Sequence, residues 1–117
     1  MKRLLIVWVV FAPLGIIACK KASTNSGTSS VDPTVCENTN YTYTDDIKII
    51  IDAKCATSGC HDGGEAPNYL GYANSFKFKS GIQTTSLNST EMPKGGLSLS
   101  QTEKELLQCW INGGAPE

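Results

Sequence analysis

Hydrophobic and polar residues divide the chain into an apolar start, a polar stretch and a mixed remainder. The apolar start is LLIVWVVFA, residues 4–12, and it follows Lys2 and Arg3. It is shorter than the ~20 apolar residues that a membrane-spanning helix needs. A positive end followed by a short apolar core is typical of an export signal, so we predict that residues 1–18 are a signal peptide.

The polar stretch, KKASTNSGTSSVDPTV, covers residues 20–35 and has almost no apolar content. Such a segment buries too little apolar surface to offset the conformational entropy that folding costs. We therefore predict a flexible linker here and place the folded domain at residues 36–117. A domain of this size builds a modest core, so we expect a further source of stability.

Residues 44–55, TDDIKIIIDAKC, have the periodicity of an amphipathic helix. Thr44 is a suitable N-cap, and the two aspartates after it favour the positive helix start. The β-branched run of residues 49–51 would also fit a strand, but capping and periodicity together favour a helix. The apolar side chains that share one helical face are Ile47, Ile50, Ile51 and Cys55.

The C-terminal segment has the clearest helical pattern. Ser100 and Glu103 have the spacing of a capping box, an apolar stripe follows, and a pair of glycines ends the pattern. A weaker helical pattern covers residues 69–79, with Gly81 as its expected stop, and residues 84–96 are expected to form a loop. The sequence therefore predicts an all-α domain with long loops between its helices.

The charge of the domain excludes one class of partner. Residues 36–117 contain six lysines and ten acidic residues, which gives a protein charge of −4, and no cluster of basic residues. Because phosphate backbones bind to clustered positive charge, we do not expect nucleic acid as a partner.

Cys19 closes the apolar start as GIIAC, with the small residue Ala18 before it. This ending resembles the bacterial lipoprotein signal, which implies that Cys19 is acylated and becomes the new N-terminus. An ordinary signal peptide is the alternative. Lys20 and Lys21 follow in place of the aspartate that retains some lipoproteins at the inner membrane. The resemblance thus implies a lipid-anchored protein of the cell envelope, facing the periplasm or the cell surface, with the outer membrane favoured.

Cys36 and Cys109 lie near the two ends of the predicted domain. In an oxidising compartment we predict a disulfide bond between them. It would close a long loop and stabilise the fold by about 4 kcal/mol. The alternative pairing is a local disulfide between Cys55 and Cys60.

The segment CATSGCH, residues 55–61, holds two cysteines and the only histidine of the chain. Haem c is attached by two thiols that add to the porphyrin vinyl groups, and the adjacent histidine binds the iron, usually as C-x-x-C-H. Here four residues separate the thiols, and Ser58-Gly59 would allow the extra residues to turn outward. The segment predicts one haem c attached through Cys55 and Cys60, with His61 as an iron ligand.

Three segments in the right order resemble the small class I c-type cytochromes, particularly the haem domains of bacterial exported lipoproteins. They are the helix leading into CATSGCH, the loop EMPKGGLS and the closing helix TEKELLQCWINGGAP. The resemblance covers roughly residues 43–116 and implies a cytochrome c-like fold, with the N- and C-terminal helices packed around the haem. It also implies that Met92 is the second axial ligand, and that the Pro67 carbonyl accepts a hydrogen bond from the His61 ring.

The function that follows is electron transfer without catalysis, because two protein ligands would fill both axial positions of the iron. We expect a membrane-tethered electron carrier whose partners are redox proteins. Alternatives are a disulfide-stabilised structural lipoprotein without cofactor and a haem protein whose sixth position is open to a gas. A zinc-binding structural module is a further alternative, with the ligands Cys55, Cys60, His61 and either Cys36 or Cys109.

Overall fold

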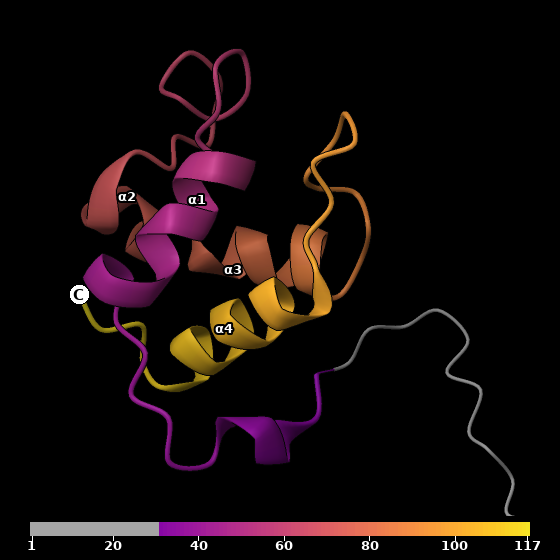
Figure 1. Cartoon of the computed structure of the whole chain (residues 1–117). Coiled ribbons are helices and arrows are strands. Elements are labelled where there is room, and N and C mark those ends of the chain that lie inside the picture. Colours follow the sequence, from indigo (N-terminus) through magenta and orange to yellow (C-terminus); the bar gives the residue numbers. More distant parts are fainter. Residues whose placement is uncertain (1–30) are drawn as a thin grey trace, which may run out of the picture.

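The computed structural model describes residues 31–117, which form a helical domain without β-strands (Figure 1). The all-α class is therefore confirmed for these residues, and none of their helices is long and apolar enough to cross a bilayer. The predicted signal peptide and the acylated Cys19 lie outside the described residues. The elements in chain order are η1 (Pro33–Cys36), η2 (Tyr43–Ile47), α1 (Lys48–Lys54), α2 (Gly71–Lys77), α3 (Lys79–Ile82), η3 (Gln83–Leu87) and α4 (Gln101–Asn112).

The first predicted helix forms as η2 continuing directly into α1. Its N-cap is Thr42, whose hydroxyl accepts a hydrogen bond from the Asp45 N–H at 3.2 Å. The Thr42 N–H in turn donates to the Asp46 carboxylate at 2.9 Å. The predicted N-cap at Thr44 is therefore wrong, because the reciprocal pair of hydrogen bonds between Thr42 and the aspartates fixes an earlier start.

The middle of the chain is more helical than the sequence predicts. α2 is followed by α3 and η3, so Gly81 lies inside a helix, and its predicted role as a helix stop is wrong. The glycine is required for space, since a Cβ at this position would lie 2.9 Å from the Tyr69 hydroxyl. The predicted loop over residues 84–96 is also wrong at its start, and the loop between η3 and α4 covers residues 88–100.

α4 agrees closely with the sequence prediction. Its capping box is complete: the Glu103 N–H donates to the Ser100 hydroxyl at 3.2 Å, and the Ser100 N–H donates to the Glu103 carboxylate at 2.7 Å. The helix ends at Asn112 with a glycine as its C-cap. Leu107 and Trp110 are fully buried, so the apolar stripe faces the core as predicted.

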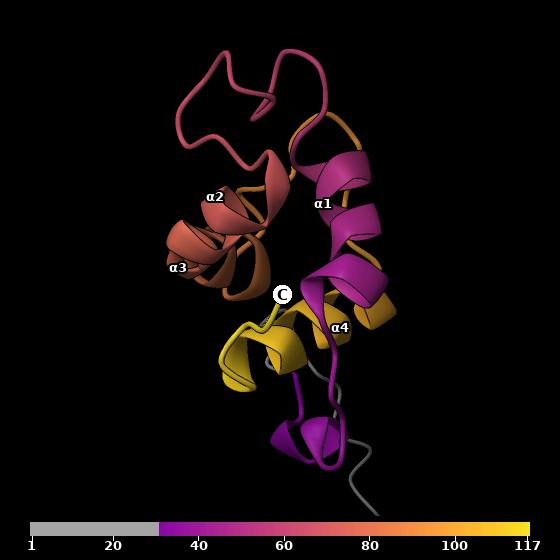
Figure 2. The same ribbon diagram turned by 90° about the vertical axis from the view of Figure 1, so that its left-hand side faces the viewer.

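The helices enclose a single core. α1 stands beside α2 and α3, and α4 runs beneath them (Figures 1 and 2). The exposed Ile49 and the buried Ile50 and Ile51 show that α1 presents one face inward, as its periodicity predicts. The other buried members of the core are Tyr43, Ile47, Cys55, Tyr69, Ile82, Leu87, Leu99, Leu107, Trp110 and Ala115.

The Gly-Ala-Pro ending is bonded to three helical elements. The Pro116 carbonyl accepts hydrogen bonds from the Tyr43 N–H of η2 at 3.0 Å and from the Trp110 Nε1 of α4 at 2.8 Å. The Ala115 carbonyl accepts a third from the Tyr72 hydroxyl of α2 at 3.1 Å, and the Ala115 side chain is fully buried. This short tail therefore links α4 to η2 and α2.

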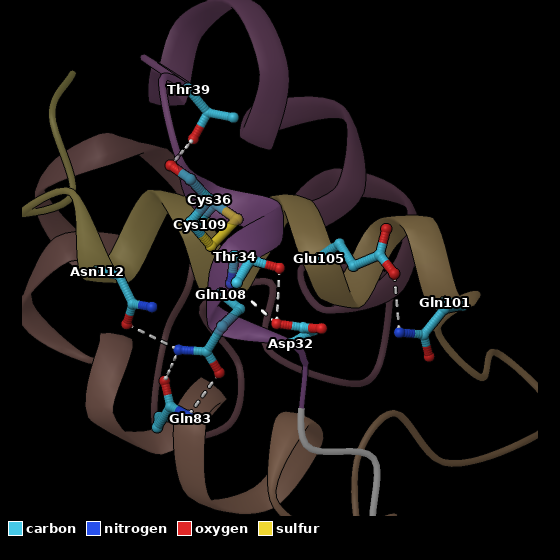
Figure 3. The surroundings of a disulfide bond; sticks show 10 residues. All are labelled: Asp32, Thr34, Cys36, Thr39, Gln83, Gln101, Glu105, Gln108, Cys109 and Asn112. Carbon is cyan, nitrogen blue, oxygen red and sulfur yellow. Dashed lines mark hydrogen bonds between the residues drawn. A yellow bond between two sulfur atoms is a disulfide. The ribbon is translucent and has the colours of Figure 1, made fainter. Parts of the chain in front are cut away.

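The predicted disulfide bond joins Cys36 of η1 to Cys109 of α4 (Figure 3). The two residues are 73 apart in sequence, so the bond closes most of the domain into a covalent ring. Beside it, the side-chain amides of Gln83 and Gln108 exchange hydrogen bonds of 2.9 and 3.0 Å that link η3 to α4. Among the described residues, the first helical element is η1, which starts at Pro33 within the last part of the predicted linker and packs on α4.

Candidate functional site

A cavity of about 440 Å³ lies between two long loops and the helical pair α3 and η3. The loops cover residues 55–70 and 88–100, and they extend from the same end of the domain (Figures 1 and 2). The volume lies within the range of about 300–1,000 Å³ that is typical of small-molecule and cofactor sites. The residues predicted to bind the haem all line this cavity: Cys55, Cys60, His61 and Met92.

Cys55 is the C-cap of α1 and belongs to the core, with 7% of its surface exposed. Burial raises the pKa of this thiol to about 11, with smaller contributions from the negative charges of Cys60 and Glu103. Cys60, in contrast, is exposed. Both cysteines are free, so the alternative of a local disulfide between them is not formed.

The two additional residues between the cysteines form a turn. The Cys60 N–H donates to the Thr57 carbonyl at 2.9 Å, and Gly59 has a φ of +77°, a conformation that glycine adopts without strain. The His61 N–H then donates back to the Cys55 carbonyl at 3.2 Å, which closes the segment. The predicted outward turn is thus confirmed. Because of this turn, the residues that follow the four-residue spacer return to the backbone of Cys55.

The His61 ring is half-buried and packs edge-on against Tyr69, with 5.2 Å between the ring centroids. Its Nδ1 atom is buried and has no hydrogen-bond partner among the residues that the structure describes. The predicted hydrogen bond to the Pro67 carbonyl is therefore not formed, although Pro67 also lines the cavity. Leaving a buried polar atom unpaired costs about 1–3 kcal/mol.

Tyr69 packs against His61, a contact that was not among the sequence predictions. It is 5% exposed, and its ring also packs edge-on against Phe78 with 6.2 Å between centroids. Its N–H donates to the His61 carbonyl at 3.0 Å and its hydroxyl donates to the Phe78 carbonyl at 3.4 Å. Burial raises the pKa of Tyr69 to about 12, so the phenol is neutral at ordinary pH. The one sequence signal is Gly81, which makes room for this hydroxyl.

Met92 reaches the cavity from the second loop. It is half-buried, and its N–H donates to the Thr85 carbonyl of η3 at 2.9 Å. The fold therefore brings a thioether to the same cavity as the only imidazole of the chain, although the two residues are distant in sequence.

Lys54, at the end of α1, lies at the edge of the cavity and connects it to the second loop. Its ammonium donates to the Ser98 carbonyl at 3.3 Å and lies 3.9 Å from the Glu103 carboxylate of α4. Glu65 and Lys94 add one charge of each sign to the lining. The mostly apolar wall is thus bordered by both positive and negative side chains.

The zinc-binding alternative lacks a fourth ligand, because both candidates for it, Cys36 and Cys109, form a disulfide bond with each other. Within residues 31–117 no three side chains of His, Cys, Asp and Glu are grouped so that they could hold a metal ion. The donors of the cavity are instead spread around a space large enough for a cofactor.

Comparisons of the chain with models of known protein families, with curated proteins and with solved structures gave no match.

Proposed function

We propose that this domain is a cytochrome c-like electron carrier that holds one haem c in the 440 Å³ cavity. The observation that supports the proposal best is the convergence of four donors on one space. Cys55, Cys60 and His61 come from the first loop and Met92 from the second, and all four line the cavity. Cys55, Cys60 and His61 are neighbours in sequence, so the informative part of this convergence is that Met92, from a separate loop, lines the same cavity, which favours a common ligand.

The chemistry of the donor set fits a covalently attached haem. In this proposal the thiols of Cys55 and Cys60 bind the porphyrin, and His61 and Met92 are the axial ligands. The bound haem would supply reversible one-electron chemistry, and a thioether ligand would favour the reduced iron and raise the reduction potential. The buried and unpaired Nδ1 of His61 is consistent with an imidazole ring that reaches its final orientation only when the haem is bound.

The remaining parts of the cavity have the properties that such a cofactor requires from a protein. Apolar side chains, among them Ile82, Pro93 and Leu97, line the wall and would exclude water from the iron. Tyr69 supports the His61 ring against α3, while the turn at residues 57–60 sets the separation of the two thiols. No group in this arrangement is placed to transform a substrate once His61 is engaged, so we propose electron transfer and not catalysis.

The proposed place of action is the cell envelope, where a lipid on Cys19 would tether the domain to a membrane and redox proteins would be its partners. η1, which continues from the linker, lies beneath α4, whereas both cavity loops lie at the opposite end of the domain (Figures 1 and 2). This arrangement supports the proposal, because the tether would not obstruct a partner that approaches the cavity.

The proposal is tested by producing the full chain in cells that attach haem c and purifying it from membranes. We expect a coloured protein whose absorption survives acid-acetone extraction and whose mass exceeds that of the acylated polypeptide by one haem. His61→Ala should lose the normal spectrum, whereas Ser80→Ala, at an exposed position in α3, should retain it. A folded, colourless and iron-free protein from such cells would overturn the proposal and favour the structural lipoprotein.

Methionine ligation needs a separate test. The oxidised protein should show the weak long-wavelength absorption band expected when methionine sulfur binds ferric haem, and Met92→Ala should abolish it and lower the reduction potential. An unchanged oxidised spectrum in Met92→Ala would remove Met92 from the iron and favour the alternative with an open sixth position.

A further inference from the structure

Met92 separates two cavities. It lines the large cavity that contains His61 and also a smaller one of about 50 Å³, together with Pro93 and Ser86. A residue that borders two cavities has fewer neighbouring atoms to fix its position by packing. Methionine is in addition a flexible side chain with three rotatable bonds. The hydrogen bonds of the backbone around Met92 are therefore important for its position.

The backbone around Met92 is held at one carbonyl oxygen. The Thr85 carbonyl accepts a hydrogen bond from the Met92 N–H at 2.9 Å and another from the Ser89 hydroxyl at 2.9 Å. The same Ser89 hydroxyl accepts a hydrogen bond from the Glu91 N–H at 3.2 Å. Ser89 thus links Glu91, the residue before Met92, to the same Thr85 carbonyl that accepts the hydrogen bond of Met92.

The acceptor belongs to a helical segment that is bonded to α3. Thr85 lies in η3, and its own hydroxyl donates to the Gly81 carbonyl of α3 at 2.8 Å. Along residues 88–100, Ser89 is the one side chain for which the structure shows hydrogen bonds back to η3 and onward to the loop backbone. The Ser98 hydroxyl, in the same loop, makes no hydrogen bond to any described residue, although Ser98 also lines the smaller cavity.

We propose that Ser89 is a positioning residue that fixes Met92 on the wall of the large cavity, an inference that rests on the proposed function for its effect on iron ligation. Through Thr85, the hydroxyl holds the loop closed so that the thioether faces the cavity. Removing it would leave the Glu91 N–H without its acceptor and would allow the Met92 segment to open.

The first experiment follows deuterium exchange of residues 88–93 in the full-length protein. Opening of a segment held by one or two hydrogen bonds should become roughly 5- to 30-fold more frequent when they are removed. We therefore expect exchange to rise by about this factor in Ser89→Ala and to remain at the wild-type rate in Ser98→Ala and in Ser89→Thr, which retains the hydroxyl. Unchanged exchange in Ser89→Ala, with a native circular dichroism spectrum, would overturn the inference.

The second experiment titrates the oxidised haem protein with imidazole, which competes with Met92 for iron. Ser89→Ala should bind imidazole about 5- to 30-fold more tightly than the wild type, and the control variants should not. If the wild type shows methionine ligation but Ser89→Ala shows no tighter binding, the inference fails and the proposed function stands. If the wild type shows no methionine ligation, that part of the proposed function fails, and deuterium exchange still decides the role of Ser89.

Discussion

The two ends of this domain are built in opposite ways. One end, which we call the clamp, consists of Cys36, Cys109, Trp110, Ala115 and Pro116, and joins η1, η2, α2 and α4 by a disulfide and by hydrogen bonds to buried groups. The other end consists of the loops 55–70 and 88–100, where the cysteines are free and the buried Nδ1 of a histidine is unpaired. Figures 1 and 2 show these loops far from η1.

This difference separates the links that stabilise a small domain from its candidate functional site. An 82-residue domain with long loops has few residues from which to build a core. Concentrating covalent and hydrogen-bonded links in the clamp allows the cavity end to keep unpaired groups that would otherwise be too costly.

The largest effect is expected from removing the disulfide. Cys36→Ala with Cys109→Ala should lower the free energy of unfolding by about 4 kcal/mol, measured by urea unfolding under oxidising conditions. Because the clamp lies away from the cavity, the folded fraction should bind the proposed haem as the wild type does. Wild-type protein treated with a reductant is the control, and loss of haem from the folded variant would show that the two ends are not independent.

A second change to the clamp should have about half this effect. Trp110→Phe removes the Nε1 donor to the Pro116 carbonyl and leaves a gap in the core, so we expect a loss of roughly 2 kcal/mol in thermal denaturation. Tyr72→Phe, which removes only the hydroxyl that donates to the Ala115 carbonyl, should cost about 1 kcal/mol. Equal losses in the free energy of unfolding would show that Trp110 contributes no more to the stability of the clamp than the Tyr72 hydroxyl does.

At the cavity end, Gly81→Ala should lower the free energy of unfolding by about 1 kcal/mol and change the spectrum of the proposed haem. The added Cβ would lie 2.9 Å from the Tyr69 hydroxyl, so the Tyr69 ring must shift against His61. Combining it with Tyr69→Phe removes the clashing hydroxyl and should restore the haem spectrum. If the spectrum of the double variant is changed as much as that of Gly81→Ala alone, the effect of the substitution is not caused by the Tyr69 hydroxyl.

The two cysteines of CATSGCH, Cys55 and Cys60, should differ in reactivity. In protein made without haem attachment, iodoacetamide should label Cys60 readily and Cys55 at least about 100-fold more slowly at pH 8, because Cys55 is buried and its pKa is raised to about 11. The rate at Cys55 should keep rising with pH up to about 11. Mass spectrometry of the labelled peptides makes the measurement, and equal rates at pH 8 would contradict the buried position of Cys55.

The raised pKa also sets the sign of a stability change. The folded state keeps the Cys55 proton up to about pH 11, whereas the unfolded chain loses it at lower pH. Folded protein without haem should therefore lose stability as pH rises from about 9 to 11. If haem is attached, labelling of Cys55 but not of Cys60 after unfolding would show that the single thioether bond is at Cys60.

The sequence predicts those parts of the fold that depend on local signals. The capping box of Ser100 and Glu103 and the apolar stripe after it define α4 almost to the residue, since cap and periodicity agree. The disulfide could be predicted because only one distant pair of cysteines remained after Cys19 and the two cysteines of CATSGCH were assigned.

The far wall of the cavity could not be predicted in the same way. Gly81 and the Ser/Thr-rich residues 83–87 have weak helix propensity, and their helical form depends on packing against α4 and Tyr69. The hydrogen bonds of Thr85 and Ser89 were not visible either, because serine and threonine hydroxyls have many possible acceptors and the sequence does not show that one carbonyl accepts from both Ser89 and Met92. Tertiary contacts decide these features.

The position of the disulfide also determines how the domain would bear tension along its chain. A pull between the two ends of the polypeptide passes from Cys36 through the sulfur atoms to Cys109, and the intervening residues carry none of the load. Both cavity loops lie inside that bypassed segment. A single proteolytic cut in either loop would likewise leave the two fragments joined by the disulfide bond.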